Sequence, residues 1–153
     1  MDPTTFGLLS LRVVVGVTFL LHGLDKLGDV AGTQQFFRSL EIPAPALTAP
    51  FVAVIEAVGG LLLIVGLATR LVGAALTANM LVALVTAHDN LEFFVADGGI
   101  ELELLLAGAS LAIVLAGAGR FSLDGALDLE RRISVWWRDH NVGALVGRST
   151  SPR

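Results

Sequence analysis

Residues 49–68, APFVAVIEAVGGLLLIVGLA, form an apolar run in which Glu56 is the only charged side chain. A helix of about 20 apolar residues is long enough to cross the hydrocarbon core of a bilayer. A charge at the centre of such a helix costs about 2.5–3.5 kcal/mol even on a lenient insertion scale, so it is rarely without a partner or a function. This stretch therefore predicts a membrane protein and makes Glu56 the first candidate for a functional residue.

Three further apolar runs accompany it, at residues 6–27, 71–87 and 99–118. None of them alternates apolar and polar residues as the strands of a membrane barrel would, so each is predicted to be a helix. The chain is 54% hydrophobic and 16% charged, with a mean hydropathy of +0.77, whereas a soluble domain has about 25% charged residues. The predicted fold is an all-α membrane protein, a four-helix transmembrane bundle over residues 1–119.

The basic residues are divided unequally between the two ends of this bundle. Four spans place both termini on one side, and all the basic residues except Lys26 and Arg38 lie on that side. Cytoplasmic segments of membrane proteins are enriched in Lys and Arg. We therefore expect a multi-pass protein of the inner or plasma membrane, with both termini in the cytoplasm.

Two connections between the spans have distinctive sequences. Thr69 and Arg70 alone separate the second run from the third, so these two spans are expected to form an antiparallel hairpin. The longer first connection contains Phe36, Phe37 and Leu40, whose spacing predicts a short helix that lies against the bundle.

After the last span the chain becomes amphipathic. Residues 120–140 combine apolar residues at helical spacing with charged ones and include Trp136 and Trp137. This pattern predicts a helix lying in the cytoplasmic membrane interface, and a soluble tail helix is the alternative. Residues 141–153 are expected to be a flexible tail.

Composition excludes several kinds of chemistry. The chain has no cysteine, which removes thiol catalysis, disulfide exchange and thiolate-bound iron–sulfur clusters. Its net charge of -4 argues against binding to nucleic acid.

Six ionisable residues lie within or at the ends of the spans, and simple topology places all of them in the outer half of the bundle: His22, Lys26, Glu56, His88, Glu101 and Glu103. At 1.5 Å per residue, His22 lies roughly 8 Å and Glu56 about 10 Å below the outer ends of their spans. Glu101 and Glu103 are two residues apart, and two residues turn a helix by about 200°, so only one of them can face a shared point. The sequence predicts a polar pocket formed by these side chains.

Ordinary structural roles are the alternative for each member of this set. Lys26 and the residues at span ends could simply reach the headgroups. Glu56 is too deep and too short for that, so it is expected to face a partner, with His22 predicted first and an ion pair with Lys26 as the other choice. Arg12, near the cytoplasmic end, is interpreted as snorkelling to the interface.

A series of short motifs follows in order along the chain: LHGLDKL at 21–27, IPAP at 42–45, EAVGG at 56–60, GLATR at 66–70, His88, GGIEL at 98–102 and GAGRFSLD at 117–124. This ordered set resembles the DoxX family over about residues 8–124. The resemblance implies a small four-span membrane protein linked to redox and sulfur metabolism, a family that includes a thiosulfate-to-quinone oxidoreductase subunit. Because the chain has no cysteine, any sulfur chemistry here cannot pass through a protein persulfide.

Three functions are compatible with these features. The first is a redox-associated protein that binds a quinone or another small oxidisable molecule in the outer pocket, where a His and a carboxylate could carry protons. A haem or metal held by His22 and His88 is a weaker choice of cofactor. The second function is a non-catalytic membrane anchor or assembly subunit for a redox protein partner, and the third is a small solute or proton transporter. The bilayer is the expected environment, and an oligomer is compatible with the sequence.

Overall fold

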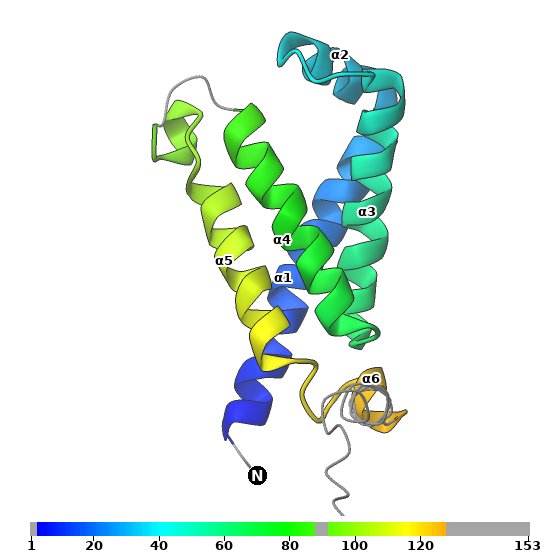
Figure 1. Ribbon diagram of the computed structural model, residues 1–153, viewed down its shortest axis with the longest axis vertical. Coiled ribbons are helices and arrows are strands. Elements are labelled where there is room, and N and C mark those ends of the chain that lie inside the picture. The colour runs from blue at the N-terminus through cyan, green and yellow to red at the C-terminus, as the bar shows by residue number, and fades with distance from the viewer. Residues whose placement is uncertain (1–2, 88–91, 128–153) are drawn as a thin grey trace, which may run out of the picture.

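The computed structural model describes residues 3–87 and 92–127 of the chain, and within them it contains helices and turns without strands (Figure 1). The elements, in chain order, are α1 (Pro3–Gly28), α2 (Val30–Ser39), α3 (Pro45–Val65), α4 (Thr69–Thr86), the short 3-10 helix η1 (Val95–Asp97), α5 (Glu101–Ala116) and α6 (Leu123–Ala126). The predicted all-α membrane class is confirmed.

Three helices, α1, α3 and α4, are long and apolar enough to cross a bilayer, with 26, 21 and 18 residues. The fourth predicted span corresponds to α5, which is apolar but has 16 residues, slightly fewer than the roughly 17–25 that a spanning helix usually has. In Figure 1 the four long helices run up and down side by side. We call the end that carries α2 and η1 the α2 end, and the opposite end, with the first residues of α1 and with α6, the α6 end.

Helices α1 and α3 pack most closely because their facing residues have almost no side chains. A Cβ added to Gly23 would lie 2.2 Å from the backbone nitrogen of Ala57, and one added to Gly60 would lie 2.4 Å from that of Leu20. Small residues at such positions let two helix backbones approach each other, which is a common way to associate helices in lipid. The backbones of α1 and α3 are therefore in close contact.

The second close pair is α4–α5. A Cβ added to Gly73 would lie 2.9 Å from Val114 Cγ2. Between the pairs, a buried apolar core contains Phe19, Leu63, Leu76 and Ile113. The bundle is thus two tightly packed helix pairs joined by one core.

The predicted hairpin between the second and third spans is present, but its turn comes earlier than expected. Helix α3 ends at Val65, because Gly66 has a φ of 73° and Ala68 a φ of 50°, both in the left-handed region. Helix α4 then begins at Thr69. The run 49–68 therefore includes the turn, and apolarity alone did not reveal that glycine ends the helix.

At the α6 end two buried charged residues hold the segment after α5 against the rest of the bundle. Arg12 is 2% exposed and donates to the carbonyl oxygens of Ala118 and Phe121. Asp124 accepts hydrogen bonds from the backbone N–H groups of Ala68 and Thr69, at 2.7 and 2.8 Å. The prediction that Arg12 snorkels to the interface was wrong, because the chain supplies buried carbonyl acceptors that a sequence does not reveal.

Of the predicted amphipathic helix at 120–140, the structure describes only its first part. Ser122 caps α6 by accepting a hydrogen bond from Gly125 N at 3.0 Å. Trp136 and Trp137, and the predicted tail at 141–153, lie outside the described residues.

Candidate functional site

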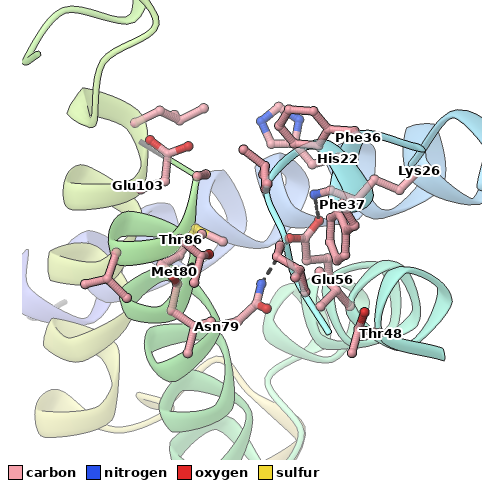
Figure 2. Close-up of a pocket in the computed structure, with 18 of the residues that line it drawn as sticks. His22, Lys26, Phe36, Phe37, Thr48, Glu56, Asn79, Met80, Thr86 and Glu103 are labelled. Carbon is pink, nitrogen blue, oxygen red and sulfur yellow. Dashed lines mark hydrogen bonds and ion pairs between the residues drawn. The ribbon is translucent and has the colours of Figure 1, made fainter. Parts of the chain in front are cut away.

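A cavity of about 1060 Å³ opens at the α2 end, between the α1–α3 pair and the α4–α5 pair (Figure 2). Most of its wall is apolar and includes Phe19 from α1, Phe51 from α3 and Met80 from α4. Ligand sites commonly have this character, with predominantly apolar walls and a few placed polar groups. The polar and ionisable side chains on the wall are His22, Asp25, Lys26, Glu41, Thr48, Glu56, Asn79, Thr86 and Glu103.

Glu56 is the polar centre of the cavity. Its side chain is 2% exposed, and it forms an ion pair with Lys26 Nζ through one carboxylate oxygen. The other oxygen, Oε1, accepts a hydrogen bond from Asn79 Nδ2 at 3.0 Å. A buried carboxylate requires such partners because burial removes its hydration. The cluster Lys26–Glu56–Asn79 therefore joins α1, α3 and α4 at one point of the cavity wall.

Helix α2 covers the cavity, and local capping explains why it forms. The Asp29 side chain accepts a hydrogen bond from Gly32 N at 2.8 Å, so it satisfies a backbone donor at the start of the helix. The predicted short helix is thus confirmed, and it carries Phe36 and Phe37 to the cavity wall. Phe37 is buried and Phe36 is half exposed, as expected for a helix lying across the end of a bundle.

His22 also lines the cavity, but the structure gives Glu56 other partners. The His22 side chain is exposed, one helical turn before Lys26 on α1. The partner predicted first for Glu56 was His22, but the structure contains the alternative pairing, with Lys26. Both positions lie on the same face of α1, and the longer lysine side chain reaches farther into the bundle (Figure 2).

The two acidic residues at the start of α5 point in different directions. Glu103 lies on the cavity wall. Glu101 accepts a hydrogen bond from the backbone nitrogen of Val95, at 3.2 Å, and is not part of that wall. His88 lies outside the described residues, so its relation to the cavity stays a prediction.

Asn79 bonds Glu56 and lines the cavity, but the pocket predicted from the sequence did not include it. The signal was present, because Asn79 lies at about the depth of Glu56 on a neighbouring antiparallel helix, and an amide inside a membrane helix also needs a partner.

Within residues 3–87 and 92–127, no three His, Asp or Glu side chains gather in a way that could hold a metal ion. The described part of the cavity wall provides hydrogen-bonding and charged side chains. Whether His22 and His88 could hold a haem or metal together stays a prediction, because His88 lies outside the described residues.

The sequence model of the DoxX family matches residues 7–89, which contain α2 to α4 and all of α1 except its first four residues. The chain belongs to the DoxX family. The match covers more than half of the chain, and it stops short of the 8–124 range that the motifs suggested. Lys26, Glu56 and Asn79 all lie inside the matched part.

Three curated proteins have sequences similar to part of this chain. A Bacillus subtilis (strain 168) protein named "Putative oxidoreductase CatD" is 42% identical over 78 residues, which are 51% of this chain and 57% of that protein. The Escherichia coli (strain K12) inner membrane proteins YqjF and YphA are 34% identical over 64 residues and 35% identical over 63 residues. These matches cover 42% and 41% of this chain, and 48% and 45% of the relatives. The chain thus spans about half the length of the curated relatives it matches. No solved structure matches significantly.

Proposed function

We propose that this DoxX-family membrane protein binds a quinone, or an oxidisable molecule of similar size and polarity, in the cavity at the α2 end. The observation that carries the proposal is a cavity of about 1060 Å³ with apolar walls and one buried hydrogen-bonding cluster. A molecule with a polar ring and an apolar tail matches both parts of such a wall. The relative named "Putative oxidoreductase CatD" supports a redox role.

The cluster has hydrogen-bond capacity beyond its internal bonds. A lysine ammonium has three N–H donors and an asparagine amide has two, while Glu56 accepts one bond from each of Lys26 and Asn79. The remaining donors suit the carbonyl oxygens of a quinone ring. Reduction of a quinone to a quinol takes up two electrons and two protons. The exposed His22 would pass protons from water to the ring, Glu56 would do so only after taking up a proton itself, and a separate redox protein would supply the electrons.

The proposed placement in the membrane follows the distribution of basic residues. The α2 end, with the cavity, faces the outer side, and both termini and an interfacial helix after Ser122 face the cytoplasm. Support comes from the positive-inside rule and from the relatives that are named inner membrane proteins.

A second candidate function is a non-catalytic anchor or assembly subunit of a redox complex. The observation that favours it is that Glu56 already has partners on two other helices, as a purely structural carboxylate would. On this alternative the cluster holds α1, α3 and α4 together, and the cavity has no quinone ligand.

Quinone-dependent stabilisation separates the two. The purified protein in lipid nanodiscs is heated with and without decylubiquinone, and its unfolding midpoint is recorded. A ligand at 100 times its Kd stabilises the folded state by about 2.7 kcal/mol, so a rise in the midpoint is expected. Ala83→Phe, which fills part of the cavity, should abolish the rise, whereas Ala78→Phe on the exposed face of the same helix should retain it. An unchanged midpoint, or an equal rise in both variants, would contradict quinone binding at this site.

A further inference from the structure

Three apolar side chains of α3 and α4 both line the cavity and lie on the outside of the bundle. Phe51 is 64% exposed, Val82 is 58% exposed and Val85 is 74% exposed. A residue that is at once on a cavity wall and on the outer surface marks the place where the cavity reaches that surface. The cavity therefore has a mouth between α3 and α4.

This mouth belongs to the lipid-facing surface of the helices. On α3, Phe51 is one member of a row of exposed apolar residues at helical spacing, namely Leu47, Phe51, Val54, Val58, Leu61 and Val65. On α4, Val82 and Val85 lie beside the exposed Leu81. Both helices are candidate membrane spans, and an apolar face of a spanning helix contacts lipid. The mouth therefore opens toward the bilayer.

The packing of the helices explains why a gap exists there. Close packing ties α3 to α1 and α4 to α5, as Gly23 and Gly73 show. Helices α3 and α4 are joined to each other at the α6 end by the short Gly66–Ala68 turn, and Figure 1 shows them diverging toward the α2 end. Each helix of the hairpin is held by a different partner, so the α2 end of the hairpin is open.

The opposite side of the cavity carries ionisable side chains among its apolar ones. His22 and Asp25 of α1 line the cavity and are exposed, and Glu103 lines it from α5. The exposed residues at the rim thus differ between the two sides. On the α3–α4 side they are mainly apolar, with Phe51, Val82 and Val85 beside Thr86, and on α1 they are His22 and Asp25. An apolar solute would cross the first and avoid the second, because removing ionised groups from water is costly.

We propose that the cavity is loaded sideways from the bilayer, through a portal formed by Phe51, Val82 and Val85. The ligand class is an amphipathic molecule dissolved in the membrane. Its hydrogen-bonding head reaches the Lys26–Glu56–Asn79 cluster, and its apolar part remains between α3 and α4. The inference rests on the proposed function for the use of the cavity, but the portal can be tested without a quinone.

The absence of cysteine from the chain allows a single reporter thiol to be introduced. Ala83→Cys places the thiol on the cavity wall, and Ala74→Cys places one at an exposed position of the same helix, away from the cavity. Each variant, in nanodiscs, is reacted with pyrenylmaleimide, which dissolves in lipid, and separately with a sulfonated maleimide, which stays in water. The lipid-soluble reagent should label the Ala83→Cys protein at least fivefold faster than the sulfonated one.

The portal is then blocked by a large side chain. Val82→Trp added to Ala83→Cys should slow pyrenylmaleimide labelling at least fivefold. Added to Ala74→Cys, an exposed position two helical turns from Val82, it should leave labelling within twofold. Val85→Trp is the second blocking variant, in case Val82→Trp does not give folded protein by gel filtration. Faster labelling of the Ala83→Cys protein by the sulfonated reagent, or no effect of a folded blocking variant, would overturn the portal.

These outcomes are independent of quinone binding. If labelling follows the portal and decylubiquinone gives no stabilisation, the route from the bilayer stands and the proposed ligand is wrong. If decylubiquinone stabilises the protein and the blocking variants do not slow labelling, quinone binding is supported and the portal is wrong.

Discussion

Asn79 Nδ2 donates a hydrogen bond to Glu56 Oε1 at 3.0 Å, so an amide from α4 meets a buried carboxylate from α3. This contact joins α3 to α4 in the part of the hairpin where the two helices diverge. The same carboxylate pairs with Lys26 of α1. Glu56 therefore links both helix pairs across the cavity wall, and the stability of the α2 end should depend on it.

Asn79→Leu should lower the stability of the bundle by about 2 kcal/mol, because hydrogen bonds to charged groups contribute about 1.5–3 kcal/mol. The unfolding midpoint in detergent is the measurement. Thr77→Val is the matched control, since the Thr77 hydroxyl donates only to Gly73 O of its own helix, at 2.8 Å. Equal midpoints for the two variants would show that the Asn79 contact contributes nothing.

Removing one partner of the ion pair should lower the free energy of unfolding more than removing both partners. Lys26→Met leaves the Glu56 carboxylate buried with Asn79 alone, and loss of one partner of a buried pair costs about 3–5 kcal/mol. Lys26→Met combined with Glu56→Gln should recover at least half of that loss. A double-mutant cycle on the unfolding free energy gives the coupling. Strictly additive losses would argue against a coupled pair.

Gly23→Ala should separate α1 from α3 and destabilise the protein by about 3 kcal/mol, because overpacking typically costs 1–3 kcal/mol and the added carbon meets backbone, 2.2 Å from Ala57 N. Gly108→Ala on α5 is the control, since nothing lies within 4 Å of its Cβ position. Alanine favours helix over glycine by about 0.5–1 kcal/mol, so this variant should be neutral or stabilised. A folded Gly23→Ala protein of unchanged stability would refute the close packing.

Asp124→Asn should weaken the α6 end by about 1–2 kcal/mol. The carboxylate accepts hydrogen bonds from two backbone N–H groups at the start of α4, a position where negative charge is favoured. Asp97→Asn, in the exposed turn η1, is the control. Hydrogen exchange of the Ala68 and Thr69 amides is the most local measurement, and it should accelerate only in the first variant. Unchanged exchange at both amides would show that the Asp124 charge does not protect them.

Much of the fold could be predicted from apolarity and length, since both are local properties of the sequence. The helical spans, the hairpin and the short helix containing Phe36 and Phe37 all follow from them. The end of α3 could not be placed, because Gly66 and Ala68 end the helix through backbone conformation inside an apolar run. The role of Arg12 was missed for a different reason: its acceptors, Ala118 and Phe121, are carbonyl groups more than 100 positions away in the sequence.

The candidate site was predicted in part. Depth along a helix follows from residue counting, and it placed His22, Lys26 and Glu56 at one end of the bundle. Rotation about the helix axis does not follow from counting, so depth alone could not choose between His22 and Lys26 as the partner of Glu56, nor between Glu101 and Glu103 for the cavity wall. The same depth argument, applied to neutral polar residues as well as ionisable ones, would have placed Asn79 near Glu56.

The most direct test of quinone binding in the cavity is photolabelling with an azidoquinone in nanodiscs, followed by peptide mapping. The account predicts covalent label in residues 48–56 of α3 and 79–87 of α4, reduced at least fivefold by excess decylubiquinone and by Ala83→Phe, and retained in Ala78→Phe. Label spread evenly along the lipid-facing surfaces, unaffected by decylubiquinone and by Ala83→Phe, would contradict the central claim.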